Sequence, residues 1–236
     1  MKHSPKGILV AILVSVAALN KTSAAEADLL EPLRPSVQRA ISEFDQIDAT
    51  RKKELKEAAA FIRDRQERKL PADLTFICTH NSRRSHLSQL WAQTAAHYYD
   101  ITNVAAHSGG TEVVACNIRT VRTLRRAGFS IVQSTRGTNP VYLAQFSETQ
   151  PIVKMYSKLF ASAENPQKDF AALFCCDQAA GGCPVVPGAA LRLPILYVDP
   201  KVSDYSSAEE ATYDERSRQI AREMFFLMSQ VKTQKS

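Results

Sequence analysis

The sequence predicts an α/β protein in which a parallel sheet carries helices on both faces. Two observations lead to this class. Apolar runs of strand length occur at 74–78 and 170–176, as expected of strands that are buried on both sides. Segments with apolar residues at helical spacing lie between the runs, and strands that alternate with helices form parallel sheets. Such sheets bind ligands at the carboxyl ends of their strands, so the residues after each run are candidates for a site.

Length and composition bound the possible functions. The chain has 236 residues, enough for one domain with an appendage. The formal net charge of +6 is spread along the chain. It therefore indicates a solvated surface with a local anion site, and it gives no indication of nucleic-acid binding. No zinc-finger, heptad or low-complexity pattern and no internal repeat is present, which excludes the classes that depend on them.

Residues 1–25 are typical of a secretory signal peptide. Basic Lys2 and Lys6 precede an apolar run at 7–19 that is short for a membrane span, and small residues at 22–25 offer a cleavage site. We therefore expect an exported protein, periplasmic or secreted, whose mature form is not embedded in a membrane. An uncleaved anchor or a buried helix is the alternative.

Residues 26–70 predict a helical extension ahead of the catalytic domain at 71–236. Apolar residues recur at helical spacing on both sides of a break at 48–50: Val37, Ile41, Phe44, Ile47, Leu55, Ala59 and Ile62. We expect these stripes to pack on the main domain. Docking of a partner protein is the alternative.

The first apolar run leads into the pattern Cys-x5-Arg-Ser, from Cys78 to Ser85, at the start of a predicted helix. Loop N–H groups and the helix N-terminus together form an anion nest, and Arg84 adds a fork for two oxygens of a tetrahedral oxyanion. These positive groups favour the thiolate of Cys78, a nucleophile. The expected oxyanion-binding residues are Thr79, His80, Asn81, Ser82, Arg83 and Arg84. A buried core cysteine beside solvated arginines is the alternative.

The next elements follow from periodicity. Residues 85–99 predict a helix with Trp91 in the core, and 104–107 a strand that leads into a Ser-Gly-Gly turn at 108–110. Residues 117–126 predict a basic helix that ends at Gly128. We interpret its arginines, Arg119, Arg122, Arg125 and Arg126, as a solvated surface, with an anion-binding face as the alternative.

Residues 141–146 and 153–160 predict two strands, a hairpin added to the sheet, to which we assign no role. After the apolar run at 170–176, a further strand is predicted at 191–196 and a final helix at 207–231. The pair Asp199-Pro200 falls between these two elements, so Asp199 is predicted near the strand ends that also carry Cys78.

Five cysteines are present: Cys78, Cys116, Cys175, Cys176 and Cys183. An odd number leaves room for a reactive thiol. Cys116 is interpreted as structural. Side chains alternate along a strand, so only one of Cys175 and Cys176 can face the site. Six residues separate Cys176 from Cys183, and a structural disulfide between them is one interpretation of that spacing in an exported protein.

The segment from Cys78 to Ser85, with Asp199-Pro200 before the last helix, resembles the low-molecular-weight protein tyrosine phosphatases and the related thioredoxin-coupled arsenate reductases. The resemblance covers roughly residues 74–230, and the spacing of Cys176 and Cys183 is similar to that of the arsenate reductases. It implies that Arg84 binds the oxyanion, Ser85 steadies the thiolate and Asp199 is the general acid. His80 stands where relatives commonly have glycine.

The arsenate reductases imply reduction of arsenate to arsenite by a relay from Cys78 through Cys176 to Cys183, which a thioredoxin-like donor then reduces. The phosphatases imply hydrolysis of a phosphate monoester, such as a phosphotyrosine protein, through a cysteinyl-phosphate. A non-catalytic phosphate- or sulfate-binding module is a further alternative. None of these functions requires a metal or an organic cofactor. Known relatives mostly work in the reducing cytoplasm, which contrasts with the predicted export.

Overall fold

The computed structural model describes residues 24–177 and 186–232. The expected signal peptide at 1–25 lies outside the described residues except for Ala24 and Ala25. Cys183, the expected last thiol of the relay, also lies outside them.

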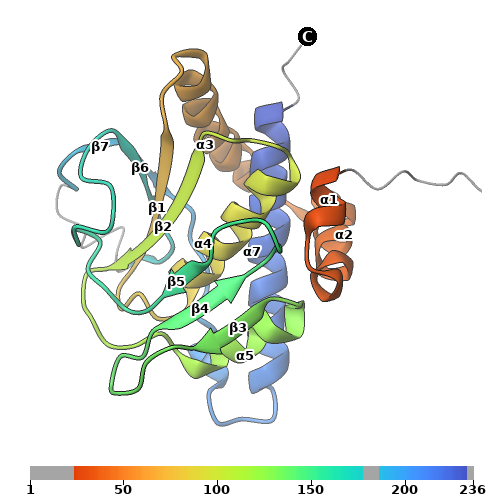
Figure 1. Cartoon of the computed structure of the whole chain (residues 1–236), viewed down its shortest axis with the longest axis vertical. Helices are drawn as coiled ribbons and strands as arrows, with labels where there is room; N and C mark the ends of the chain where they lie inside the picture. The colour runs from red at the N-terminus through yellow and green to blue at the C-terminus, as the bar shows by residue number, and fades with distance from the viewer. Residues whose placement is uncertain (1–23, 178–185, 233–236) are drawn as a thin grey trace, which may run out of the picture.

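The main sheet has four parallel strands in the order β2-β1-β6-β7 (Figure 1). Its strands are β1 (Ala72–Cys78), β2 (Val104–Gly110), β6 (Phe170–Phe174) and β7 (Ala189–Pro194). Cys78 of β1 pairs with Gly110 of β2, and Ile77 with Phe174 of β6, so the carboxyl ends of these strands meet at one edge. The predicted α/β class with a parallel sheet is confirmed.

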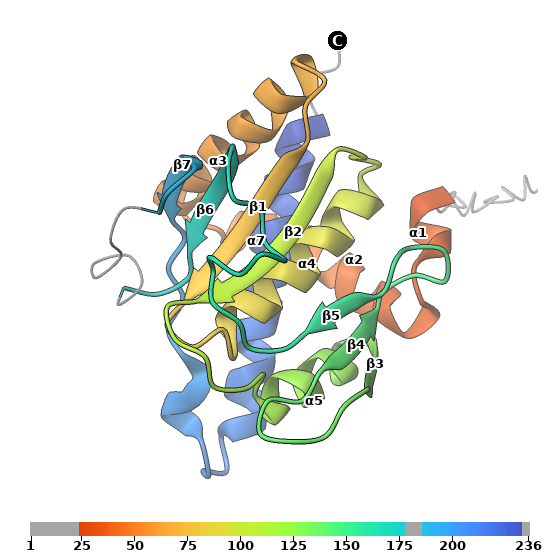
Figure 2. The same ribbon diagram turned by 60° about the vertical axis from the view of Figure 1, so that its left-hand side comes forward.

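One side of this sheet is covered by helices, and Figure 2 shows them behind the strands. α4 (Arg84–Tyr98) packs on β1 and β2, α3 (Ala49–Glu67) touches β1 and β7, and α7 (Glu209–Lys232) packs on α3 and α4. Trp91 of α4 is buried, as predicted, and its Nε1 donates to Ser217 Oγ at 2.9 Å.

The chain before β6 pairs with the free edge of β2 through a parallel bridge between Gly110 and Leu159. Gly110 N donates to Lys158 O at 2.8 Å, and Phe160 N donates to Gly110 O at 2.9 Å. A Cβ on Gly109 would lie 2.3 Å from Phe160 Cα, so this close approach requires glycine. Residues 108–110 therefore belong to β2 itself, and the predicted Ser-Gly-Gly turn is wrong.

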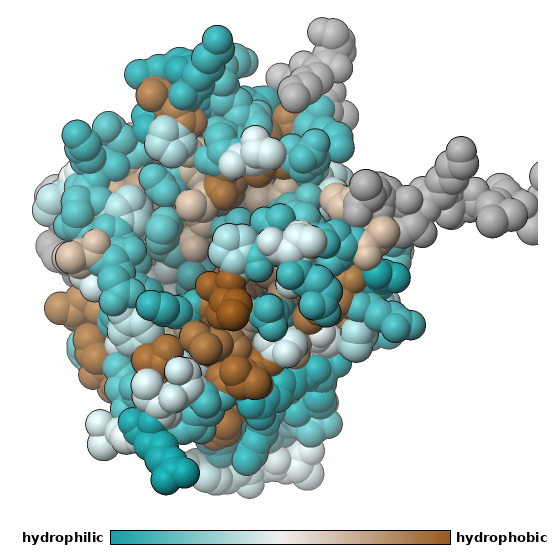
Figure 3. Space-filling view, viewed as in Figure 1, coloured by the Kyte–Doolittle hydropathy of each residue, from teal (hydrophilic) through white to brown (hydrophobic). Residues whose placement is uncertain are grey.

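Residues 130–155 contribute a second, antiparallel sheet in the order β3-β4-β5. Its strands are β3 (Ser130–Gln133), β4 (Tyr142–Gln145) and β5 (Val153–Met155). The predicted hairpin is present as β4 and β5, but it does not extend the main sheet, and β3 was missed. β3 was missed because it is short and three of its four residues are exposed. Figure 3 shows apolar side chains gathered over this sheet, where Val132 and Ile152 are exposed.

The N-terminal extension forms helices that pack on the main domain, as predicted. Besides α3 it contains α1 (Ala24–Asp28), η1 (Glu31–Leu33), α2 (Arg34–Ser42) and η2 (Phe44–Gln46). Both α2 and α3 pack against α7. Asp48 caps α3 by accepting a hydrogen bond from Arg51 N at 2.8 Å, which accounts for the break before it. Across the described ranges, no helix is long and apolar enough to cross a membrane.

The helix α5 (Ile118–Ala127) has the predicted ends. The Asn117 side chain accepts from Arg119 N, and Gly128 closes the helix with φ of 109°. A Cβ on Gly128 would lie 2.2 Å from Pro32 O, because the extension packs against this end of α5. Glycine is therefore required at position 128 both by the helix end and by the extension.

Candidate active site

Cys78 is the last residue of β1, and its thiol lies at the edge where the parallel strands end. The following loop leads directly into α4, whose first turn contains Ser85. Cys78 Sγ lies 3.1 Å from Ser85 Oγ, and the cysteine is 4% exposed. A hydroxyl at this distance can donate a hydrogen bond to a thiolate, and the N-terminus of α4 favours negative charge at the same place.

Asn81 supports this arrangement from inside the loop. It is fully buried and adopts a left-handed backbone with φ of 45°. Its Nδ2 donates to Ser85 Oγ at 2.9 Å, and its Oδ1 accepts from Lys158 N at 3.0 Å. Because the amide occupies an acceptor site of Ser85, the hydroxyl proton remains available for Cys78 Sγ. The left-handed residue of the loop is thus Asn81, and His80 needs no glycine-like conformation.

Replacing Asn81 by alanine is expected to lower the free energy of unfolding by about 2–4 kcal/mol. The substitution removes two buried hydrogen bonds and leaves a left-handed residue without a side chain that stabilises it. Asn81→Gly loses the same hydrogen bonds without the backbone strain, so it should cost about 1 kcal/mol less. Urea unfolding of the two variants measures the difference. Equal losses would contradict a strained backbone at this position.

Arg84 is the first residue of α4. Its guanidinium binds Tyr197 and Asp199, in the chain that follows β7. Nη1 donates to Tyr197 O at 2.9 Å, and Nη2 donates to Asp199 Oδ2 at 2.8 Å. Nε is buried and has no hydrogen-bond partner among the described residues. Arg84 therefore retains a buried donor for an oxyanion while its other end fixes the segment that carries Asp199.

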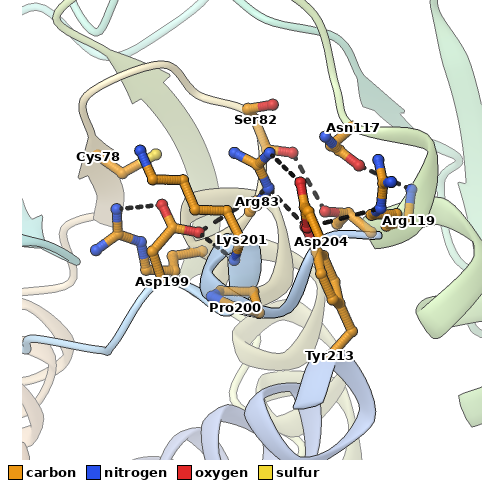
Figure 4. A network of polar contacts seen from close by, with 12 residues as sticks. Cys78, Ser82, Arg83, Asn117, Arg119, Asp199, Pro200, Lys201, Asp204 and Tyr213 are labelled. Carbon is orange, nitrogen blue, oxygen red and sulfur yellow. Dashed lines mark hydrogen bonds and ion pairs between the residues drawn. The ribbon is translucent and has the colours of Figure 1, made fainter. Parts of the chain in front are cut away.

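Asp199 follows β7 by a few residues and caps the short helix η3 (Pro200–Ser203). Its Oδ1 accepts from Lys201 N at 3.1 Å. Figure 4 shows the Lys201 side chain extending past Asp199 toward Cys78. The Asp199 side chain is 17% exposed, so its carboxyl group, bound to Arg84, reaches the solvent. A carboxyl group in this place is a candidate proton donor.

The guanidinium of Arg83 is held in a polar network with α7 and α5, drawn in Figure 4. Arg83 Nε donates to Tyr213 OH at 2.8 Å, and Tyr213 OH donates to Asp204 Oδ1 at 2.8 Å. Arg83 Nη2 and Arg119 Nε lie 3.4 Å and 3.6 Å from the Asp204 carboxylate. The Asp204 carboxylate therefore competes with an oxyanion for Arg83, which we expected to bind the oxyanion. Asp204 and Tyr213 were missed because nothing near them in the sequence marks them.

The arginines of α5 are engaged by acids of α7. Arg119 lies 2.8 Å from Glu209 and Arg126 lies 2.6 Å from Asp214. Arg125 donates to Ile131 O. The solvated surface that we expected is present at Arg122, Arg125 and Arg126, which are exposed, whereas the Arg119 side chain is only 17% exposed and pairs with Glu209 of α7.

The other side chains of the loop point away from the thiol. Ser82 Oγ donates to Ala115 O at 2.7 Å, and His80 Nε2 lies 3.2 Å from Glu112 Oε2. For His80 and Ser82, any contact with an oxyanion would thus come from the backbone N–H groups, as the nest predicts. Within residues 24–177 and 186–232, no group of three or more His, Cys, Asp or Glu is placed to hold a metal ion.

The two adjacent cysteines after β6 face different surroundings. Cys176 Sγ lies 3.5 Å from Oγ1 of Thr79, the residue after Cys78. Cys175 Sγ lies 3.6 Å from Ser88 Oγ of α4, and burial raises the pKa of its thiol well above the usual range. Cys176 is therefore the thiol beside the loop. Burial also raises the pKa of Cys116, to about 12, in keeping with the structural role expected of it.

His86 lies fully buried in α4 behind the loop, with Nδ1 3.2 Å from Ser108 Oγ. Burial, aided by the charge of Lys158, lowers its pKa from 6.5 to about 3. At a pH between these values the unfolded chain binds the proton and the folded chain does not. The stability that the folded state owes to neutral His86 is present above pH 6.5 and is lost as the pH falls toward 3.

The free energy of unfolding is therefore expected to fall by about 1.4 kcal/mol per pH unit through His86 alone between about pH 6 and 4. Urea unfolding across this range measures the slope, and His86→Gln is the control from which this contribution is absent. Parallel slopes for the two proteins would contradict a neutral His86.

The structure thus places the Cys-x5-Arg-Ser loop between β1 and α4, at the edge where the parallel strands of an α/β fold end. No protein-family model and no curated protein matches the chain.

Solved structures resemble it at 10–13% identity. A low-molecular-weight phosphotyrosine phosphatase from Vibrio cholerae O395 is 12% identical, with 70% of this chain and 99% of that chain covered and a TM-score of 0.45. A YwlE mutant from Bacillus subtilis is 13% identical, with 69% and 99% covered and a TM-score of 0.42. YwlE arginine phosphatase from Geobacillus stearothermophilus is 10% identical, with 69% and 94% covered and a TM-score of 0.41.

Proposed function

We propose that the protein hydrolyses phosphate monoesters, including phosphorylated side chains of proteins, through a cysteinyl-phosphate on Cys78. One observation carries the proposal. A single sheet edge brings together a thiol, the serine hydroxyl 3.1 Å from it, an arginine with a buried free donor, and an aspartate bound to that arginine. Each group has a defined task in phosphoryl transfer.

In the first step the phosphate group occupies the loop, held by its N–H groups and by Arg84. The Cys78 thiolate attacks phosphorus, the ester P–O bond breaks, and Asp199 gives its proton to the departing oxygen. The arginine and the N–H groups stabilise the negative charge that the equatorial oxygens carry in the transition state.

In the second step water attacks the phosphorus of the cysteinyl-phosphate, and the Asp199 carboxylate takes a proton from that water. The P–S bond breaks, phosphate is released, and Cys78 leaves as a thiolate. The Ser85 hydroxyl, oriented by Asn81, donates a hydrogen bond to the leaving sulfur. The same carboxyl group thus acts as acid and then as base.

A second candidate function is reduction of arsenate, and the position of Cys176 favours it. Its sulfur lies beside Thr79, next to the nucleophile, where a resolving thiol would have to be. Cys78 would attack arsenate with loss of water, and Cys176 would then attack Cys78, which forms a disulfide and releases arsenite. Cys183 would attack Cys176, and a thioredoxin-like dithiol would reduce the resulting disulfide. Export by the signal peptide at 1–25 would then require an electron supply outside the cytoplasm.

The experiment compares two assays on the purified, reduced protein. One follows hydrolysis of para-nitrophenyl phosphate, and the other follows arsenate-dependent oxidation of NADPH through thioredoxin and its reductase. We expect hydrolysis that survives Cys176→Ser and Cys183→Ser, without arsenate turnover. Repeated arsenate turnover that either substitution abolishes would establish the reductase instead. A protein that binds phosphate without either activity would be a binding module.

A further inference from the structure

A buried contact joins the N-terminal extension to the segment that carries Asp199. Arg51, in the first turn of α3, donates from Nη2 to Leu196 O at 2.5 Å. Its guanidinium carbon also lies 5.5 Å from the centre of the Tyr197 ring. The two partners are 145 and 146 residues away from Arg51 in the chain, and Asp199 lies two residues after Tyr197.

The segment is held by two arginines that use successive carbonyl groups. Arg84 in the site binds Tyr197 O, and Arg51 in the extension binds Leu196 O. The segment continues the sheet, since Ile195 N donates to Phe174 O and Tyr197 N donates to Cys175 O. Successive carbonyls of an extended chain point in opposite directions, so the two arginines hold it from opposite sides. Arg84 also binds the Asp199 carboxylate, and its own position therefore depends on the segment.

The contact is partly buried. The Arg51 side chain is 15% exposed, and its Nε lies 3.4 Å from Oε2 of Glu223, which is 4% exposed. Burial raises the pKa of Glu223, and the charge of Arg51 acts in the opposite direction. Asp48 fixes the backbone of Arg51 through the cap of α3, and Glu54 holds Nη1 at 2.7 Å. A cation so constrained holds its position, unlike a mobile surface arginine.

We propose that Arg51 is a positioning residue for the general acid, and that the N-terminal extension is therefore a working part of the active site. The inference rests on the proposed phosphatase function. Arg51 touches no substrate. It sets the distance of Asp199 from the leaving oxygen by fixing the carbonyl of Leu196 and the ring of Tyr197, and proton transfer is sensitive to errors of about 1 Å.

The test is the dependence of kcat/KM on the leaving group in the full-length chain, because kcat/KM reports the step in which the ester bond breaks. Phenolate is a poor leaving group that needs a proton, whereas para-nitrophenolate departs without much help. Arg51→Gln is expected to lower kcat/KM about 10-fold or more for phenyl phosphate and less than about 3-fold for para-nitrophenyl phosphate. The inhibition constant of inorganic phosphate should change less than about 3-fold, because the loop itself is untouched.

Arg63→Gln is the matched control, since Arg63 lies on the same helix and also donates to a backbone carbonyl, that of Gln230 in α7, at 2.9 Å. It should leave kcat/KM unchanged for both substrates. Arg51→Lys keeps the charge and one donor, and it should restore part of the phenyl phosphate activity even if Arg51→Gln is poorly folded. Equal losses for both substrates in Arg51→Gln and Arg51→Lys would overturn the positioning role. A wild-type protein without hydrolysis would instead refute the phosphatase function.

Discussion

Replacing Cys78 by serine is expected to lower the rate of phosphate ester hydrolysis by on the order of 10³-fold or more. The serine hydroxyl fits the same space, so its partner Ser85 and the loop remain in place. An alcohol is a far weaker acid than a thiol, and the dipoles of the loop cannot produce a useful concentration of its anion. The measurement is kcat for para-nitrophenyl phosphate, together with the binding of inorganic phosphate, which should persist.

Cys116→Ser is the control for this experiment, because Cys116 is also a buried cysteine among the described free thiols but contacts neither Ser85 nor Arg84 in the structure. It should retain most of the activity, although burying a hydroxyl costs about 1–3 kcal/mol of stability. Substantial turnover by Cys78→Ser would mean that the thiol is not the nucleophile, and the cysteinyl-phosphate mechanism would then fail.

The second large effect is expected for Asp199→Asn, which should lower kcat/KM by about 10²- to 10⁴-fold for phenyl phosphate. Asparagine preserves the shape, and its one carbonyl oxygen can accept the hydrogen bond from Lys201 N. The bond from Arg84 Nη2 to the second oxygen is lost, but Arg84 still donates to Tyr197 O, so the segment should remain in place. Asparagine cannot give a proton to the departing oxygen. The descending limb of the kcat/KM–pH profile should therefore disappear, and the loss should be smaller for para-nitrophenyl phosphate.

Asp204→Asn is the matched control, since Asp204 is the neighbouring aspartate and also binds an arginine of the loop, Arg83. It removes one carboxylate from the same region without touching Asp199. We expect a modest loss that is equal for the two substrates and a pH profile that keeps its descending limb. If Asp204→Asn shows the leaving-group dependence and Asp199→Asn does not, Asp204 is the acid.

The sheet and the loop were predictable because their signals are local. An apolar strand, a Cys-x5-Arg-Ser pattern and a helix follow one another within about fifteen residues, and parallel strands bring their carboxyl ends together by geometry. The same rule placed Asp199 near Cys78, although 121 residues separate them in the sequence. The Asn117 cap and Gly128 end of α5 were likewise visible from single residues.

The supporting contacts were not predictable, because they depend on side chains from distant segments. The loop is supported by the backbone of Lys158, the network at Arg83 needs Asp204 and Tyr213, and Arg51 reaches Leu196 from the extension. Nothing near these residues in the sequence distinguishes them from solvated side chains. The strand β3 was missed for the related reason that a short, half-exposed strand shows little alternation.

The packing of α2 and α3 against α7 also has a consequence for synthesis. The ribosome makes α2 and α3 well before α7, so the apolar stripes of the first two helices stay uncovered until α7 has been synthesised. Contacts between such distant parts of a chain form slowly, and exposed apolar surface promotes aggregation in the meantime. The helices α2 and α3 therefore need protection by a chaperone during synthesis, and the native fold can form only after α7 has left the exit tunnel.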